Sequence, residues 1–322
     1  MTNNVLYIVV PCFNEQEVLP ATNKQLLALL DGLVKAQAIS PESRVMYVDD
    51  GSTDDTWSII SAICQESPCA TGLKLAANVG HQNALVAGLE TAVRRAHLMV
   101  TIDADLQDDC SVIAQMLEQY EAGCDIVYGV RRERKADSWF KRNTAQAFYK
   151  FMNRLGVKTV YNHADFRLMS QRAVNQLLRY RERNLFLRGI VPLVGYRTAS
   201  VHYDRQARQA GESKYPFSKM MSFAVDGITS FSIKPVRMVF TLGIIFLFIA
   251  LCMFIYTLVA YFTHRAVSGW ASLILSLWFI GGCVLLSLGI VGEYIGKIYI
   301  EVKDRPRYNV DKTIGLDDNS EI

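Results

Sequence analysis

The sequence predicts an α/β domain with a mostly parallel sheet, followed by a C-terminal hairpin of two membrane-spanning helices. Three observations predict it. Short β-branched runs alternate with longer helical patterns through residues 1–215, which is the order of βαβ units. Apolar residues then run almost unbroken at 236–263 and again at 270–291. Charged residues lie at the ends of these two runs.

The strands of the α/β domain are expected where short apolar runs occur, each followed by a helical pattern. The expected strands are 5–10, 45–48, 72–75, 98–102 and 125–128. The expected helices are 18–33, one that begins at Asp54, 82–95 and 111–120. Right-handed crossovers make such strands parallel, and open α/β sheets bind ligands at the carboxyl ends of their strands. The residues that follow each strand are therefore the most informative about function.

Both apolar runs are long enough to cross a bilayer, because a spanning helix needs about 20 mostly apolar residues. The flanking cations are Lys214, Lys219, Lys234 and Arg237 at the first run and Lys297, Lys303, Arg305 and Arg307 after the second. Only Arg265 is a firm cation in the link between the runs. The positive-inside rule therefore places residues 1–215 and the C-terminal tail, residues 297–322, in the cytoplasm. A buried hairpin of a soluble protein is disfavoured because both runs exceed ordinary buried helices.

Two features lie at the ends of the predicted hairpin, residues 236–296, one before its first span and one after its second. Residues 216–235 mix apolar and charged side chains, so they are too polar to span a membrane and suited to lie among the lipid headgroups. A surface helix of the soluble domain explains the same pattern equally well. The Gly292-x-x-x-Gly296 spacing allows a close helix contact, either within the hairpin or between the subunits of a homo-oligomer.

Composition excludes several classes of protein. The 34 basic and 31 acidic residues give a net charge of +3, which is too small for a general nucleic-acid binder. Seven cysteines without a Cys-x-x-Cys pair fit a reducing compartment. The N-terminal apolar run ends at Pro11 without the basic stretch or cleavage site of a secretory signal. No G-x-G-x-x-G and no Walker loop follows a strand, which disfavours dinucleotide and P-loop sites.

Polar and acidic residues follow the first four expected strands, as PCFNE, DDGSTD, NVG and DADLQ in turn. Each segment alone is explained by ordinary turn or capping chemistry. Asp103 and Asp105, however, flank Ala104 at the end of an apolar strand, where two carboxylates repel unless a cation joins them. Oxygen ligands of this kind suit Mg²⁺ or Mn²⁺ held partly by a substrate phosphate.

The ordered motifs resemble those of the family-2 glycosyltransferases, which have the GT-A fold, a Rossmann-like α/β fold. GESKY at 211–215 and the C-terminal hairpin make the chain similar to the polyprenyl-phosphate branch. That branch includes dolichyl-phosphate mannose synthases, bactoprenol glucosyltransferases and the transferase that loads formamido-arabinose onto undecaprenyl phosphate. The resemblance covers residues 5–308, nearly the whole chain.

This resemblance implies roles for the residues at the carboxyl edge of the sheet. Pro11, Asn14 and Glu15 are expected to line the nucleotide pocket, and Asp50 to read the base or ribose. Asp103, Asp105 and Gln107 are expected to hold the metal and the diphosphate, with Asp105 also catalytic. Many relatives continue DADLQ with prolines, whereas Asp108-Asp109-Cys110 stands here and is expected to alter the following turn.

The acceptor implied by the resemblance is a lipid monophosphate, whose second pKa of about 6 leaves it substantially dianionic at neutral pH. Such an oxygen is already nucleophilic, so its site needs cations more than a strong base. Two groups of cations occur, Arg131, Arg132 and Arg134 in one and Arg205, Arg208 and Lys214 in the other. The expected phosphate-binding residues are Arg131, Arg205, Ser213 and Lys214, with Arg131 also catalytic. Arg132, Arg134 and Lys135 are expected to be solvated or to bind headgroups.

Asp165, in the segment ADFRLMS, resembles a family position that faces the sugar. It is expected to orient sugar hydroxyls or to stabilise an oxocarbenium-like centre, with Arg167 pairing internally. A purely structural ion pair of Asp165 with Arg167 remains an alternative. Residues 136–150 are expected to form a lid over the donor and the lipid.

The sequence thus predicts a membrane-anchored, metal-dependent, inverting transferase that moves a sugar from a nucleotide sugar to undecaprenyl or a similar polyprenyl phosphate on the cytoplasmic membrane. UDP-glucose is the favoured donor, ahead of UDP-N-acetylglucosamine, a formamido-arabinose donor and GDP-mannose. A processive polysaccharide synthase is disfavoured because Q-x-x-R-W is absent and two spans make a poor polymer channel. A non-catalytic membrane scaffold or lipid-phosphate carrier would have no use for Asp103-x-Asp105.

Overall fold

The computed structural model describes residues 4–105, 107–131, 163–183, 185–204, 234–262 and 269–316. They belong to two compact units. The first unit contains the described residues up to 204 and those from Arg305 onward, and it is an α/β sheet domain. The second contains two long helices between residues 234 and 304.

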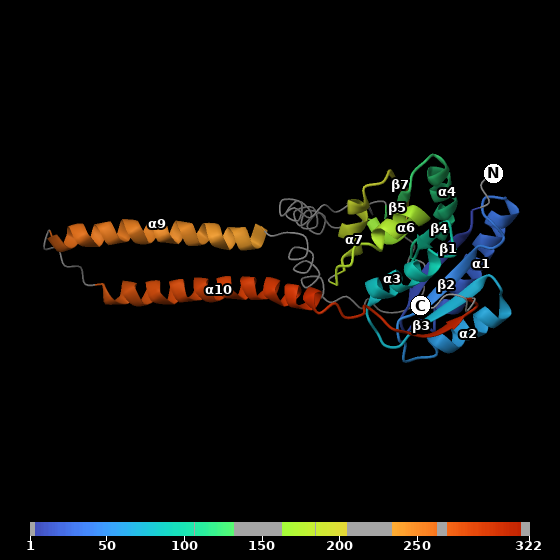
Figure 1. Ribbon diagram of the computed structural model, residues 1–322, viewed down its shortest axis with the longest axis horizontal. Coiled ribbons are helices and arrows are strands. Elements are labelled where there is room, and N and C mark those ends of the chain that lie inside the picture. Colours follow the sequence, from blue (N-terminus) through green and yellow to red (C-terminus); the bar gives the residue numbers. More distant parts are fainter. Residues whose placement is uncertain are drawn as a thin grey trace. The chain divides into compact units, whose positions relative to one another are not determined.

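The sheet of the first unit has eight strands in the order β7-β5-β6-β4-β1-β2-β3-β8 (Figure 1). These strands are β1 Leu6–Cys12, β2 Arg44–Asp49, β3 Ala70–Leu75, β4 Leu98–Thr101, β5 Ile126–Arg131, β6 His163–Ser170, β7 Thr198–Tyr203 and β8 Val310–Ile314. The pairs β1/β2, β1/β4, β2/β3 and β5/β7 are parallel, whereas β6 is antiparallel to β4 and β5, and β8 is antiparallel to β3. A mixed, mostly parallel sheet confirms the predicted fold class.

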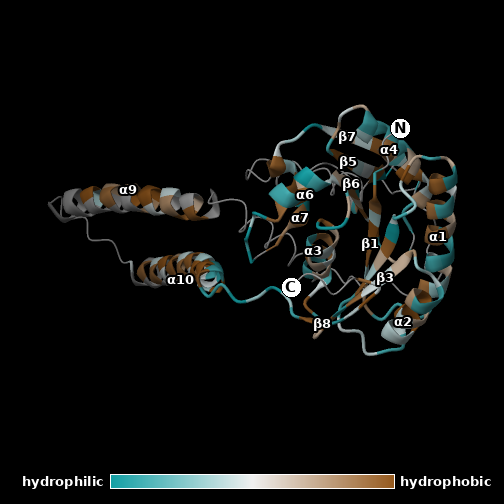
Figure 2. Ribbon diagram, turned by 45° about the vertical axis from the view of Figure 1, so that its right-hand side comes forward, coloured by the Kyte–Doolittle hydropathy of each residue, from teal (hydrophilic) through white to brown (hydrophobic). Residues whose placement is uncertain are grey.

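Helices cover both faces of this sheet, and Figures 1 and 2 show α1 and α3 on opposite sides of β1 and β2. The helices are α1 Leu19–Lys35, α2 Thr56–Glu66, α3 His81–Ala92, α4 Ile113–Glu121, α6 Gln171–Leu177 and α7 Leu187–Ile190. Side chains of a strand alternate between its faces. Ile8 and Val10 accordingly share one buried cluster with Leu26 of α1, while Val9 meets α3 at Gly88.

Glycine at position 88 lets α3 approach the sheet closely. A Cβ at Gly88 would lie 2.8 Å from Val48 Cγ2 and closer still to Val9 Cγ1. The first residue of α3, His81, follows directly on the loop after β3. Close packing of α3 on β1 and β2 therefore fixes the start of this helix near the carboxyl ends of the central strands.

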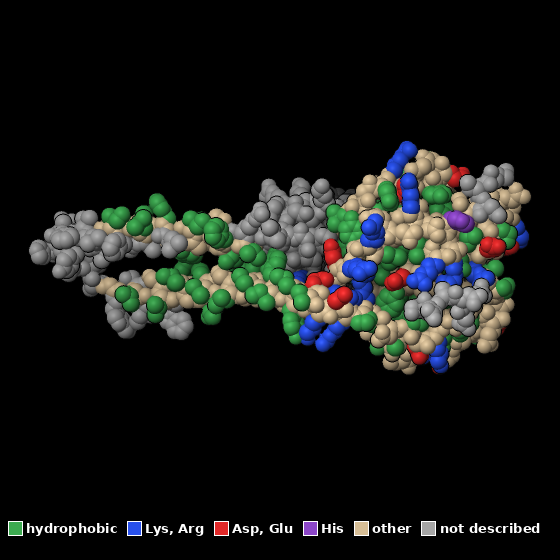
Figure 3. Space-filling view, in the orientation of Figure 1, with side chains coloured by type: hydrophobic (Ala, Val, Ile, Leu, Met, Phe, Trp, Pro, Cys, Tyr) green, Lys and Arg blue, Asp and Glu red, His purple; other side chains and the backbone are tan. Residues whose placement is uncertain are grey.

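The second unit consists of α9, Lys234–Phe262, and α10, Trp270–Val302. The rings of Phe246 and Phe279 meet edge-on with centroids 5.7 Å apart, so the two helices contact each other. Within the part of the chain that is described, one segment, Phe279–Val302, is apolar and long enough to cross a membrane, and none of it is buried. Figure 3 shows hydrophobic side chains along α10 and charged ones gathered towards its C-terminal end.

The C-terminal residues differ from the tail that the sequence predicts. Residues 297–302 continue α10, so the helix extends past the predicted end of the second span at Val291. Val310–Ile314 then joins the edge of the sheet as β8, where Gly72 pairs with Ile314. Arg44 Nη1 donates a hydrogen bond to the Gly315 carbonyl at 2.8 Å. Five residues of mixed polarity carry little strand signal alone, but they pair with the otherwise open edge of β3.

Candidate active site at the carboxyl edge of the sheet

The loops after β1 and β2 are joined by hydrogen bonds centred on Asn14. This residue has a φ of 54°, in the left-handed region that asparagine tolerates better than most residues. Asn14 N donates to Ser52 Oγ at 3.0 Å, and Thr53 N donates to Asn14 Oδ1 at 2.9 Å. Glu15 N donates to Thr56 Oγ1 at 2.9 Å. Asn14 and Glu15 are thus half-buried at the edge, whereas Pro11 is buried inside β1.

Asp50 connects the loop after β2 to the loop after β3. Its carboxylate accepts hydrogen bonds from Val79 N at 2.8 Å and from Gly80 N at 3.0 Å. The side chain is almost fully buried, and burial raises the pKa of Asp50 although the two backbone donors oppose this shift. Both carboxylate oxygens therefore bind the protein itself in this structure, and the expected contact of Asp50 with the base or ribose stays a prediction.

Gly51 makes the close approach of these two loops feasible. Its φ is +66°, and a Cβ there would lie 2.6 Å from the backbone atoms Ala77 C and Asn78 N. A side chain at this position would therefore separate the loops. Together with the Asn14 hydrogen bonds, this packing brings the ends of β1, β2 and β3 into one polar surface.

Asp103 and Asp105 follow β4 at the same edge. The Asp103 side chain is 37% exposed. Burial raises the pKa of Asp103, as do the carboxylates of Asp165, Asp108 and Asp105, whereas His81 opposes the shift. The neighbouring Gln107 is buried, and its backbone N–H donates to Asp105 Oδ1 at 3.2 Å.

The acidic cluster of Asp103 and Asp105 fits a divalent cation, because the two carboxylates repel each other. Together with Gln107 they offer the oxygen atoms that Mg²⁺ and Mn²⁺ prefer. Among the described residues, no group of three or more His, Cys, Asp or Glu is arranged to hold a metal ion. A metal site of Asp103, Asp105 and Gln107 that is completed by substrate oxygens therefore stays a prediction.

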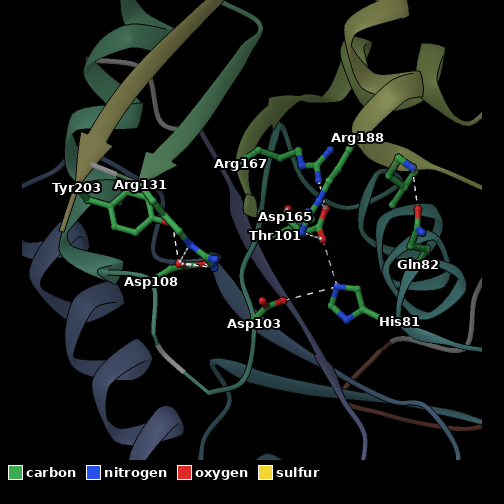
Figure 4. Close-up of polar contacts among 11 residues, drawn as sticks. His81, Gln82, Thr101, Asp103, Asp108, Arg131, Asp165, Arg167, Arg188 and Tyr203 are labelled. Atoms are coloured by element: carbon green, nitrogen blue, oxygen red, sulfur yellow. Dashed lines mark hydrogen bonds and ion pairs between the residues drawn. The ribbon is translucent and has the colours of Figure 1, made fainter. Parts of the chain in front are cut away.

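Asp165 lies on β6, whose residue Arg167 pairs with Thr101 of β4. Figure 4 shows the Asp165 carboxylate between the guanidinium groups of Arg167 and Arg188. Arg167 Nη2 contacts Asp165 Oδ1, and Arg188 Nη2 lies 3.1 Å from Asp165 Oδ2. Burial alone would raise the pKa of Asp165, but Arg188 and Arg167 outweigh it and hold the pKa well below its usual range. Asp165 is therefore ionised throughout the physiological pH range.

His81 connects Asp165 to the acidic cluster. Its Nε2 atom lies 3.5 Å from Asp103 Oδ1 and 3.8 Å from Asp165 Oδ2 (Figure 4). Thr101 Oγ1 also donates to the backbone carbonyl of Asp165 at 2.5 Å. The structure thus brings together two of the predicted site residues, Asp103 and Asp165, which are far apart in the sequence.

Arg131 is held by Asp108, a residue for which the sequence indicates only a turn. Arg131 Nε donates to Asp108 Oδ1 at 2.9 Å, and Tyr203 OH donates to the same oxygen at 2.6 Å. Burial lowers the pKa of Arg131, but Asp108 more than offsets this and raises it overall. The charge expected to face the acceptor phosphate is therefore already matched by a buried carboxylate. Asp109 caps the following 3₁₀ turn, Cys110–Val112, by accepting from Ser111 N at 3.0 Å.

The remaining predicted phosphate ligands, Arg205, Ser213 and Lys214, lie outside the described residues, as do the expected lid at 136–150 and residues 216–233 of the interfacial segment. Sequence reasoning missed His81, Arg188 and Tyr203. His81 directly follows the NVG segment, and residues that follow a strand of such a sheet are expected to line the ligand site, so the sequence does carry a signal for His81. No local signal marks Arg188 or Tyr203, because they reach the site only through the packing of α7 and β7.

A mostly parallel sheet with Asp103 and Asp105 directly after β4 at its carboxyl edge is the arrangement expected of a glycosyltransferase of the GT-A fold. The chain belongs to glycosyl transferase family 2, whose family model matches residues 7–178. A second model, the GtrB C-terminal hairpin, matches residues 234–298. This hairpin and the apolar segment of α10 associate the protein with a membrane.

Several known proteins are similar over most of the chain. An uncharacterized glycosyltransferase, YkoT, of Bacillus subtilis is 52% identical over 95% of this chain and 91% of its own length. The SfII prophage-derived bactoprenol glucosyl transferase of Shigella flexneri is 40% identical over 95% of this chain and 97% of its own length. The crystal structure of glucosyl-3-phosphoglycerate synthase from Mycobacterium tuberculosis with Mn²⁺, UDP and phosphoglyceric acid is 16% identical. The superposition covers 70% of this chain and 76% of the synthase chain, with a TM-score of 0.45.

Proposed function

We propose that this protein transfers one sugar from a nucleotide sugar to a polyprenyl phosphate, with UDP-glucose and undecaprenyl phosphate as the favoured pair. The observation that carries the proposal is the cluster of Asp103, His81 and Asp165 at the carboxyl edge of a family-2 sheet. The GtrB-type hairpin and the relatives named bactoprenol glucosyl transferase support a lipid acceptor. UDP-N-acetylglucosamine, a formamido-arabinose donor and GDP-mannose remain the alternative donors.

A divalent ion, Mg²⁺ or Mn²⁺, would be held by Asp103, Asp105 and Gln107. Once bound, it would stabilise the negative charge that develops on the departing diphosphate. Asn14 and Glu15, on the loop after β1, would contact the nucleotide. Asp50 would also serve the nucleotide pocket, chiefly by holding the loop after β3 in position through Val79 N and Gly80 N.

The acceptor phosphate would attack the anomeric carbon from the side opposite the diphosphate, which inverts that centre in one displacement. A phosphate dianion needs no general base, and Asp165 is a poor one because Arg167 and Arg188 keep it ionised. We assign Asp165 to the orientation of groups around the sugar. The cations nearest the membrane in sequence, Arg205 and Lys214, together with Ser213, would bind the lipid phosphate.

The proposed topology has residues 1–215 and the C-terminus on the cytoplasmic side, residues 216–235 at the membrane surface and a hairpin of two spans at 236–296. The long helices α9 and α10 and the cations at their outer ends support it. Phosphorylated lipid and soluble nucleotide sugar would then meet at the cytoplasmic face of the membrane.

The test is a donor panel with the purified full-length protein in detergent, undecaprenyl phosphate and Mn²⁺ or Mg²⁺, followed by mass spectrometry of the extracted lipid. The expected product carries a single sugar, and EDTA is expected to abolish it. Asp105→Asn should remove activity, while Asp31→Asn, an exposed carboxylate on α1, serves as the matched control. A product with several sugars would instead indicate a processive synthase, and no product with any donor would fit a scaffold or carrier. Full activity of Asp105→Asn would remove Asp105 from the proposed metal site.

A further inference from the structure

We propose that Gln82 is a positioning residue of the reaction, whose side chain holds α7 in the place where Arg188 meets the Asp165 carboxylate. The inference rests on the proposed function, because it takes Asp165 to orient groups around the sugar. In this role Gln82 acts through α7 rather than by contact with a substrate.

The hydrogen bond that carries the inference joins the first turns of two helices. Gln82 is the second residue of α3, and its Oε1 accepts from the N–H of Leu187, the first residue of α7, at 2.7 Å (Figure 4). The residue before Gln82 is His81, and the residue after Leu187 is Arg188. Both neighbours approach Asp165 Oδ2, His81 Nε2 at 3.8 Å and Arg188 Nη2 at 3.1 Å. One hydrogen bond thus joins the two helices from which these partners of Asp165 project.

The shortness of α7 makes such an external support necessary. The helix has four residues, and a single helical turn is not stable alone. The N–H groups of a first turn have no partner within their own helix. The residue before α7 is Phe186, whose side chain has no oxygen that accepts from them. Gln82 therefore supplies from another helix the acceptor that a capping residue would otherwise provide.

Apolar packing alone does not fix the position of α7. Leu187 and Ile190 are both buried, so α7 stays on the domain. The hydrophobic effect has no preferred direction, however, whereas a hydrogen bond restricts both a distance and an angle. The Arg188 side chain between these two residues is 45% exposed. Burial therefore does not hold its guanidinium against Asp165, and the position of the helix backbone has to do so.

The contact between Arg188 and Asp165 tolerates little movement of α7. At 3.1 Å from Nη2 to Oδ2, a displacement of about 0.5 Å takes the pair beyond hydrogen-bond distance. Misplacing a group near the reacting atoms by about 1 Å can cost about 100-fold in rate. A small shift of α7 should therefore slow turnover and leave the nucleotide-binding loops unchanged.

The experiment compares wild type, Gln82→Met and Gln82→Glu in full-length protein. Methionine keeps the length of the side chain but removes the acceptor, whereas glutamate keeps an acceptor oxygen. Gln171→Met is the matched control, because Gln171 Nε2 also donates one bond to a backbone carbonyl, that of Val93 at 2.8 Å. Gln171 follows Ser170, which pairs with the first residue of β4, so it lies at the edge of the sheet away from the site.

Three quantities are measured for each variant. They are kcat and KM in the sugar-transfer assay, UDP affinity by calorimetry with Mn²⁺, and hydrogen–deuterium exchange of the peptides that contain α7. Gln82→Met should lower kcat by about 10-fold, with KM for the nucleotide sugar and UDP affinity within about twofold of wild type. Its α7 amides should exchange about 10-fold faster.

The other variants separate positioning from a general loss of stability. Gln82→Glu should keep the slow exchange of α7, and Gln171→Met should keep the wild-type kcat. The inference is overturned by a wild-type kcat in Gln82→Met, by an equal loss of kcat in Gln171→Met, or by exchange in Gln82→Glu as fast as in Gln82→Met.

A double-mutant cycle with Arg188→Ala tests the route through Arg188. If Gln82 acts by placing Arg188, Gln82→Met should add at most about twofold to the loss of kcat caused by Arg188→Ala. A further loss of about 10-fold in the double variant would mean that Gln82 acts on another group, and would reject the inference.

Failure of the proposed function gives a different result. Wild-type protein would then form no sugar-lipid with any donor of the panel, and the exchange measurement alone would decide on Gln82. Faster exchange of α7 in Gln82→Met, with Gln82→Glu and Gln171→Met like wild type, would retain Gln82 as the residue that positions α7. Equal exchange in wild type and Gln82→Met would exclude that role.

Discussion

Replacing Asp108 by alanine tests the arrangement that holds Arg131. Removing one partner of a buried ion pair costs about 3–5 kcal/mol, because the other charge is left without compensation. The Arg131 side chain is 27% exposed, so water recovers part of this and the lower end of the range applies. Tyr203 OH also loses its acceptor at 2.6 Å, which adds about 1 kcal/mol. We expect a total loss of about 3–4 kcal/mol in the free energy of unfolding.

Thermal unfolding of the full-length protein in detergent measures this effect. For a domain of this size the expected fall in melting temperature is about 6–16 °C for Asp108→Ala. Tyr203→Phe removes the hydrogen bond to Asp108 and the longer one that Tyr203 OH accepts from Arg131 Nε at 3.3 Å, but it keeps the ion pair. It should lower the melting temperature by about 2–4 °C. The explanation is refuted if Asp108→Ala is no more destabilising than Tyr203→Phe, because Arg131 would then not depend on the Asp108 carboxylate.

Three further predictions follow from the loops and the edges of the sheet. Gly51→Ala should lower the free energy of unfolding by about 2 kcal/mol and weaken UDP binding, as measured by melting and calorimetry. Gly32→Ala is the control: no atom lies within 4 Å of the added Cβ, so it should be neutral or stabilising. Asp125 has a lowered pKa because it accepts from Arg172, so its stabilisation should be complete above about pH 4 and lost as the pH falls further; a melting series should show a shallower acid slope for Asp125→Asn. Truncation after Asp304 removes β8 and should cause aggregation through the exposed edge of β3, whereas deletion of residues 317–322 should leave light scattering unchanged.

The sequence predicts the sheet well where each strand is locally apolar and is followed by a helix. The runs at 5–10, 45–48, 72–75, 98–102 and 125–128 coincide with β1 to β5. Three strands escape this reasoning. β6 pairs antiparallel and β7 pairs parallel with β5, and each follows the preceding strand only after a long stretch of chain. β8 becomes a strand only because β3 offers it an open edge.

The candidate site shows the same division between local and long-range information. Asp103 and Asp105 are visible in the sequence because two carboxylates at one strand end need compensation. The ion-pair partners cannot be read from the sequence in this way. The pair of Asp165 with Arg188, for example, depends on the docking of α7 against α3 through Gln82. Arg131 illustrates the converse, because a cation in the expected place has a buried carboxylate as its partner.

The edge strand β8 ties the order of protein synthesis to the completion of the enzyme. Arg44 and Gly315, which share a hydrogen bond, are 271 residues apart in the chain, and both long apolar helices are translated between them. Contacts so distant in sequence form late, because a long loop must be closed first. The ribosome therefore releases β8 only after both long helices have emerged, so the sheet is completed last.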